Sequence, residues 1–100
     1  MKNIKQEFTN FLIKKGYREY TVNHTPSTVY DYLGRIEKVC IAESMSFMEL
    51  MTRIDEILPL YLDNGIKANE GKRSHESVKN ALKNFSAFVH EKRLLQKVAS

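Results

Sequence analysis

The segment from residue 72 to residue 89 constrains the fold most, because its apolar residues recur at the spacing of an amphipathic helix. These apolar residues are Val78, Ala81, Leu82, Phe85, Phe88 and Val89. Ser74 stands in the N-cap position, where its hydroxyl can satisfy an unpaired helix amide. On a neighbouring arc lie His75, Lys79, Lys83 and His90. We therefore predict a helix over residues 74–93 that packs on one side and offers a basic stripe to an anion on the other.

Three earlier segments show the same periodicity, over residues 3–15, 26–43 and 47–64, the last closed by Gly65. Their expected core residues are Ile4, Phe8, Phe11, Leu12, Val29, Tyr32, Leu33, Ile36, Val39, Cys40, Leu50, Met51, Ile54, Ile57, Leu58, Tyr61 and Leu62. With only 2 prolines and 4 glycines, the composition favours long helices over a turn-rich β fold. The sequence predicts an all-α bundle of four to five helices.

Local signals mark several ends of these helices. Gly16 suits the position just after a helix, and Pro26 fits a first helical turn. Ser46 and Glu49 form a capping-box pattern that opens the third helix. Pro59 lies inside that helix and removes one hydrogen bond, so we expect a kink or a split.

The remaining stretches read as connections. Residues 17–25 and the polar residues 66–72 are expected to be loops, and residues 94–100 a frayed tail or the start of a linker. At 100 residues the chain has the size of one domain, which we place over residues 1–100 with order from about residue 3 to residue 95.

The composition also limits location and partners. Cys40 is the single cysteine, which excludes an internal disulfide and favours a reduced setting. No signal-peptide pattern and no long apolar stretch are present, so we expect a soluble cytoplasmic chain. The formal net charge of +4 is compatible with nucleic acid or an anionic membrane surface and establishes neither.

No pattern in the chain indicates catalysis. His24, His75 and His90 fall on different segments without an acidic residue at a pairing distance, and the glycines are isolated. A metal site needs three or four convergent ligands, which one cysteine and scattered histidines do not suggest. We expect no catalytic residue, no metal, no cofactor and no small-molecule substrate in this chain.

The basic residues allow two interpretations, an ordinary solvated surface or a nucleic-acid contact. They gather in three groups, namely Lys14, Lys15 and Arg18; Arg35 and Lys38; and Lys67, Lys72, Arg73, Lys79 and Lys83. Short polar side chains that can bond phosphates or base edges accompany them at helix starts: Ser27, Thr28, Asp31, Ser74, Ser77 and Asn80.

One stretch resembles a known family. Residues 27–36, Ser-Thr-Val-Tyr-Asp-Tyr-Leu-Gly-Arg-Ile, are similar to the T-x-x-x-Y-x-x-x-I/L helix in the core-binding domain of tyrosine recombinases and phage integrases. Three further features follow the family's order: Phe8 to Leu12 before a glycine, the run from Tyr61 to Gly65, and residues 74–89 with their Phe85 centre. The similarity spans about residues 8–95.

This resemblance implies a SAM-like helical bundle that forms half of a C-shaped DNA clamp. The family's catalytic domain, with its tyrosine nucleophile, would be a separate domain, and none of the tyrosines here lies in the catalytic motif. The implied partners are double-stranded DNA, the catalytic domain of the same recombinase, and other protomers in a synaptic complex. The candidate DNA-binding residues are Ser27, Thr28, Asp31, Arg35, Lys38, Lys72, Arg73, Ser74, His75, Ser77, Lys79, Asn80 and Lys83.

Asp31 differs from the polar neutral or basic residue that the family has at this position. A carboxylate near phosphates is repelled unless it accepts from a cytosine amino group or pairs with Arg35 four residues on. Two other functions stay open: a helical protein-interaction module whose basic face is solvated, and a membrane-surface helix, which is weaker because the bundle core uses the apolar arcs.

Overall fold

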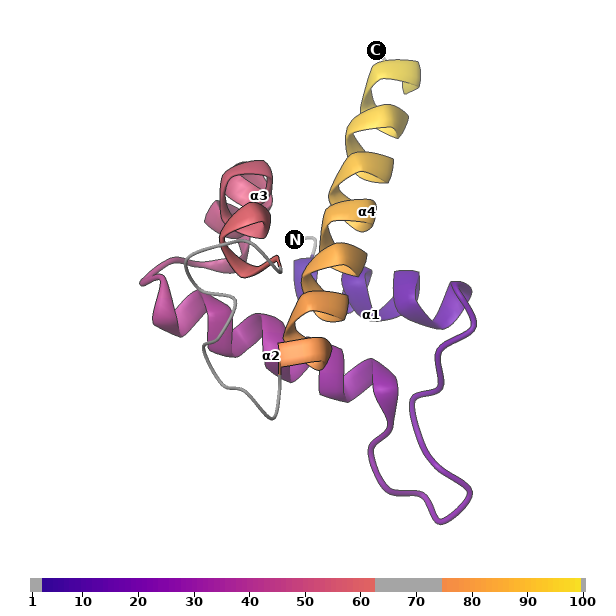
Figure 1. Ribbon diagram of the computed structural model, residues 1–100. Coiled ribbons are helices and arrows are strands. Elements are labelled where there is room, and N and C mark those ends of the chain that lie inside the picture. Colours follow the sequence, from indigo (N-terminus) through magenta and orange to yellow (C-terminus); the bar gives the residue numbers. More distant parts are fainter. Residues whose placement is uncertain (1–2, 63–74, 100) are drawn as a thin grey trace.

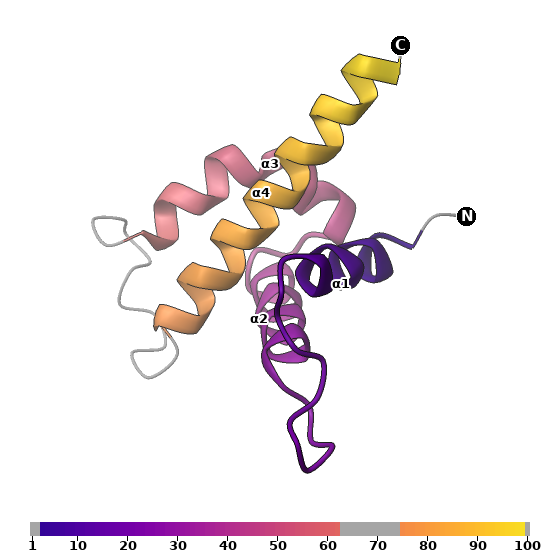
Figure 2. The same ribbon diagram turned by 90° about the vertical axis from the view of Figure 1, so that its right-hand side faces the viewer.

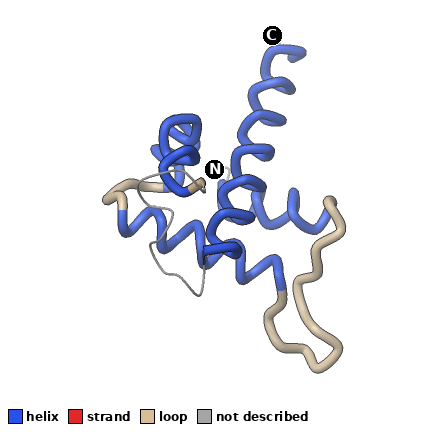
Figure 3. The backbone as a smooth tube through the Cα atoms, viewed as in Figure 1, coloured by secondary structure: helices blue, strands red, loops and turns tan. Residues whose placement is uncertain are grey.

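The computed structural model describes residues 3–62 and 75–99 and contains four helices in that part of the chain (Figure 1). These are α1 (Ile4–Lys14), α2 (Thr28–Ala42), α3 (Phe47–Tyr61) and α4 (His75–Ala99). Within the described residues the backbone is helix and loop, with one isolated β-bridge and no strand (Figure 3). The prediction of an all-α bundle is confirmed.

The helix ends follow from local chemistry. Asn3 caps α1 by accepting from the Gln6 amide at 3.3 Å. Gly16, just after α1, has a φ of 101°, a left-handed conformation that glycine adopts without steric cost. The capping box of α3 is also confirmed: the Glu49 amide donates to the Ser46 hydroxyl at 3.1 Å, and the Ser46 amide donates to the Glu49 carboxylate at 3.4 Å.

Two predicted boundaries are wrong, at Pro26 and at the tail, and the predicted split at Pro59 does not occur. Pro26 does not enter the first turn of α2 but pairs with Tyr20 in the isolated β-bridge. Pro59 does not split α3, which continues past it to Tyr61; its missing amide removes one helical hydrogen bond, to the carbonyl of Asp55. The expected tail after residue 93 is helical through Ala99, and these last turns project beyond the other helices (Figures 1 and 2). The predicted N-cap Ser74, the loop 66–72 and Gly65 lie outside the described residues.

The core forms where α4 packs against α2 and α3, with α1 closing one side. Every buried hydrophobic residue that the structure describes belongs to the predicted apolar sets. Phe85 stands at the centre: its ring lies 5.1 Å from that of Phe8, 6.0 Å from that of Phe47 and 5.9 Å from that of Phe88. Four phenyl rings from three helices thus fix how the bundle packs.

Polar contacts join the helices at the edges of the core. The Tyr61 hydroxyl donates to the Glu43 carboxylate at 3.1 Å, which gives this buried phenol its expected partner. Lys92 on α4 pairs with Glu7 on α1 at 2.6 Å. These contacts tie together residues that are distant in the sequence.

A hairpin-shaped connection leads from α1 to α2 and extends away from the bundle (Figures 1 and 2). We call residues 18–27 the α1–α2 hairpin. The Thr21 amide donates to the Thr25 carbonyl at 2.9 Å, and the Ser27 amide donates to the Glu19 carbonyl at 2.8 Å. The sequence predicted a loop here and missed this ordered pairing.

Candidate nucleic-acid interface

One side of α2 carries the polar residues that the sequence assigned to DNA. The core side of this helix is set by Val29 and Ile36, which are fully buried. Thr28, Asp31, Arg35 and Lys38 recur every three or four residues, so they share another side of the helix.

Ser27 precedes this row as the N-cap of α2. Its backbone is extended, and its hydroxyl makes no capping hydrogen bond to the helix. The Ser27 amide donates to Glu19 and its carbonyl accepts from Asp31, which fixes the backbone. The half-buried hydroxyl can donate to a ligand at the start of the helix.

Asp31 and Arg35 form an ion pair across one helical turn, with the Arg35 Nε 3.4 Å from the Asp31 Oδ1. This is one of the two roles considered for Asp31. The pair leaves no net charge on this part of α2. Lys38, one turn further on, is exposed and forms no ion pair in the part of the chain that the structure describes.

Asn80 lies where the candidate DNA-binding residues of α4 adjoin α2. Burial raises the pKa of the Tyr32 hydroxyl, and the hydrogen-bonding Asn80 side chain beside it opposes that shift. Thr28 and Arg35 are the helical neighbours of Tyr32, and Ser77 is a helical neighbour of Asn80. The contact therefore places the polar sides of α2 and α4 next to each other.

The chain just after α1 also contacts the place where α2 and α4 meet. The Asn84 amide donates to the Asn80 carbonyl at 2.9 Å and lies 3.4 Å from the Tyr17 hydroxyl. The Tyr17 and Tyr32 rings meet edge to face, 5.4 Å apart. We call Tyr17, Tyr32, Asn80 and Asn84 the polar junction. Asn80 was predicted to contact DNA, and in the structure it lies against Tyr32 where the two candidate helices pack together.

The predicted basic stripe of α4 is not a continuous open surface. Lys83 is exposed, and Lys79 is half-buried. His90, at the other end of the stripe, pairs with Asp55 of α3 at 3.1 Å, and Arg93 pairs with the same carboxylate at 3.1 Å. These contacts hold the pKa of Asp55 below its usual value, through His90 first and then Arg93. Sequence spacing offered no acidic partner for His90, and the packing of α4 against α3 supplies Asp55.

Four candidates cannot be placed as fully as the others. Lys72, Arg73 and Ser74 lie outside the described residues, and His75 begins α4 without a described side chain. The interface that the structure describes thus consists of Ser27, Thr28, Asp31, Arg35, Lys38, Ser77, Lys79, Asn80 and Lys83.

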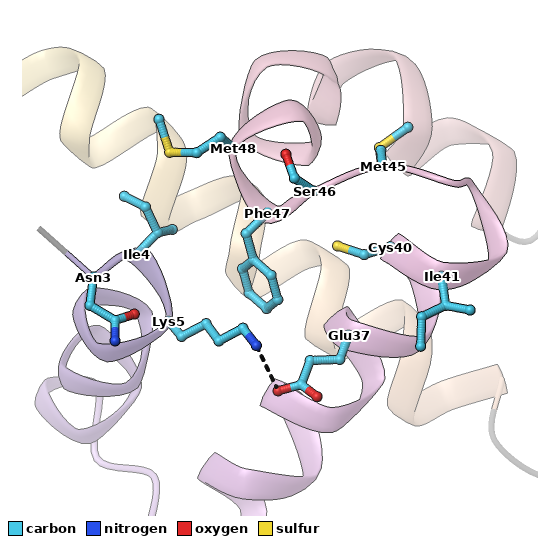
Figure 4. A pocket seen from close by; sticks show the side chains of 10 residues that line it. All are labelled: Asn3, Ile4, Lys5, Glu37, Cys40, Ile41, Met45, Ser46, Phe47 and Met48. Atoms are coloured by element: carbon cyan, nitrogen blue, oxygen red, sulfur yellow. Dashed lines mark ion pairs between the residues drawn. The ribbon is translucent and has the colours of Figure 1, made fainter.

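A second surface feature lies at the other end of α2. It is an open hollow of about 700 Å³ between the start of α1, the end of α2 and the start of α3 (Figure 4). Ile41 and Met48 at this hollow are 78% and 59% exposed, whereas Cys40 is buried, which raises the pKa of its thiol. Lys5 and Glu37 form an ion pair of 3.6 Å within it. The hollow is mostly apolar, unlike the row on α2.

The described residues contain no group of three or more histidine, cysteine, aspartate or glutamate side chains placed to hold a metal ion. Among the described helices, none combines the length and apolar character that a membrane crossing requires.

No protein-family model, no curated protein and no solved structure matches this chain. The assignment of a function therefore depends on the residues themselves and on the resemblance seen in the sequence.

Proposed function

We propose that this chain binds duplex DNA through the adjoining polar sides of α2 and α4, as the core-binding domain of an integrase-like tyrosine recombinase. The observation that supports the proposal is the packing of α4 against α2, in which Asn80 of α4 meets Tyr32 of α2 and the polar sides of the two helices adjoin. Helix sides with hydroxyls, amides and lysines suit a groove lined by phosphates.

On this proposal most of the affinity comes from phosphate contacts. Lys38 and Lys83 are the exposed cations of the interface without an ion pair in the described part, whereas Arg35 is already paired with Asp31. Such a surface gives salt-dependent binding with little sequence preference, with a dissociation constant of roughly 1–100 micromolar at physiological salt.

The wider assignment follows the resemblance. The chain would grip one half of a recombination core site in the cytoplasm, alongside a separate catalytic domain of the same recombinase and further protomers in a synaptic complex. It would not cleave DNA itself. Reading the coding sequence beyond the codon for Ser100 tests this assignment, because a recombinase catalytic domain should be encoded there.

Chemical-shift mapping with a duplex of about two helical turns tests the binding face. We expect the amides of residues 27–38 and 77–83 to shift, and the double variant Lys38→Gln plus Lys83→Gln to weaken binding. The matched control is Lys5→Gln plus Arg53→Gln, which removes the same charge from exposed sites outside the interface. Equal losses in both variants, or shifts confined to α3, would contradict the proposed face.

The alternative, a helical protein-interaction module, is favoured by the hollow at the end of α2. An amphipathic helix of a partner protein would seat apolar side chains against Ile41 and Met48. Ile41→Lys should abolish such binding and leave DNA binding unchanged, which separates the two functions.

A further inference from the structure

The proposed function leaves unused the basic residues at the base of the α1–α2 hairpin. Lys14 and Lys15 end α1, and Arg18 begins the hairpin. All three are exposed, and none forms an ion pair in the part of the chain that the structure describes. The Lys15 ammonium lies 5.3 Å from the centre of the Phe11 ring, which positions it at the surface.

The hairpin is held firmly against the start of α2. The Val29 amide donates to the Arg18 carbonyl at 3.1 Å, so the first turn of α2 and the hairpin share a hydrogen bond. The Tyr20 and Tyr30 rings pack 5.5 Å apart at the same place. Hydrogen bonds with Tyr20 and Glu19 raise the pKa of Tyr30 to about 12, so its hydroxyl stays protonated.

The only carboxylate of the hairpin is turned away from its tip. Glu19 is half-buried and accepts from the Tyr30 hydroxyl at 3.0 Å. The tip itself offers hydrogen-bond donors: the amides of Val22 and Asn23 meet no protein acceptor among the described residues. Next to them His24 has a φ of 61°, a left-handed conformation that closes the turn. A cationic base and a tip with free amides suit an anionic partner.

We propose that the α1–α2 hairpin and the cations at its base form a second contact with the sugar–phosphate backbone of the same DNA. This inference rests on the proposed function. Ser27 is both the last residue of the hairpin and the N-cap of α2, so the two surfaces are continuous. Both views place the hairpin and the N-terminal end of α4 on the side opposite the C-terminal end of α4 (Figures 1 and 2).

The hairpin is long enough for this contact. At about 3.3 Å per residue the chain from Arg18 to Asn23 reaches about 16 Å. The minor groove of B-form DNA is about 6 Å wide. With α2 and α4 at the major groove, Lys14, Lys15 and Arg18 would meet one phosphate strand while the tip reaches the strand across the adjacent minor groove.

Fluorescence anisotropy with a labelled 24-base-pair duplex, over a range of salt concentrations, tests the inference. Lys14→Gln plus Arg18→Gln should weaken binding about tenfold at low salt and reduce the slope of log K against log salt by about 1.8, because two phosphate contacts are lost. The control Lys5→Gln plus Arg53→Gln carries the same charge change and should leave that slope within about 0.5 of the parent. Circular dichroism checks that each variant folds.

Amide shifts of the parent chain on the same duplex separate the two proposals. Shifts at Val22 and Asn23 together with shifts in α2 and α4 support the inference. Shifts in α2 and α4 alone, with the Lys14 and Arg18 variant binding like the control, would overturn the inference and leave the proposed function standing. A chain that binds no DNA at low salt would overturn both.

Discussion

Replacing Phe85 by alanine tests the core of this bundle directly. Its side chain has no exposed surface and touches the rings of Phe8, Phe47 and Phe88. Phe8 and Phe47 meet it edge to face, at interplanar angles of 87° and 81°. Replacement by alanine removes the ring and, with it, all three of these contacts.

The expected cost follows from this burial. A fully buried phenylalanine replaced by alanine costs roughly 3–5 kcal/mol, and each lost aromatic pair accounts for about 0.5–1.5 kcal/mol within that sum. A domain of this size has a free energy of unfolding of about 5–15 kcal/mol. The variant should therefore lose a large fraction of its stability, and its midpoint of thermal unfolding should fall by at least about 12 °C.

Urea unfolding followed by circular dichroism measures this loss. The control is Leu94→Ala on the projecting part of α4, where the side chain is 64% exposed, and it should change stability by less than about 0.5 kcal/mol. Phe85→Leu keeps much of the side-chain volume, so its loss of stability should lie between those of Phe85→Ala and Leu94→Ala. If Phe85→Ala cost less than about 1 kcal/mol, or as little as Leu94→Ala, the packing of α4 described above would be wrong.

Three further predictions concern other parts of the chain. Ser46→Ala removes one bond of the α3 capping box and should lower the free energy of unfolding by about 1 kcal/mol, measured by urea unfolding. The pKa of Asp55 is lowered by His90 and Arg93, so its stabilising effect is present above the unfolded value of 3.8 and is lost as the pH falls through the lower folded value. Asp55→Asn should accordingly destabilise the chain at neutral pH, and the difference from the parent should vanish well below pH 3.8. Incubation with nicked duplexes should yield no covalent protein–DNA adduct, and a species that resists denaturation would reveal a nucleophile in this chain.

The core could be predicted from the sequence because it depends on periodicity. Burial repeats along each helix, so the apolar positions of α1, α2, α3 and α4 could be read without knowing how the helices pack. The Asp31–Arg35 ion pair could be predicted equally well, because the two residues are only four positions apart on one helix.

Contacts between distant residues could not be predicted in this way. His90 lies 35 positions from Asp55, and Asn84 lies 67 positions from Tyr17, so both contacts exist only once the helices have packed. No spacing rule covers such pairs. The sequence could identify Asn80 as polar and near the start of a helix. It could not show that the Asn80 side chain meets the Tyr32 hydroxyl.

The errors at helix ends have local causes. Pro26 suits a first helical turn, yet the chain pairs it with Tyr20, because residues 21–25 close a turn and the hairpin brings the two together. The β-branched residues Thr21, Val22 and Thr25 on either side of Asn23 and His24 were the available signal for this turn. At the other end, residues 94–99 contain good helix formers, so α4 continues past the exposed Leu94 and Leu95.

The apolar core stabilises the fold, whereas the polar junction orders the candidate interface. The apolar core would tolerate small rotations of α2 against α4, because hydrophobic packing has little directional preference. The contact of Asn80 with Tyr32 restricts those rotations, since a hydrogen bond requires defined directions. Tyr17 adds the end of α1 to the same cluster, and Arg18, the next residue, begins the hairpin. The spacing between the row on α2, the start of α4 and the base of the hairpin is thus set by one small group of polar contacts. Variants of that group should loosen the interface before they unfold the bundle.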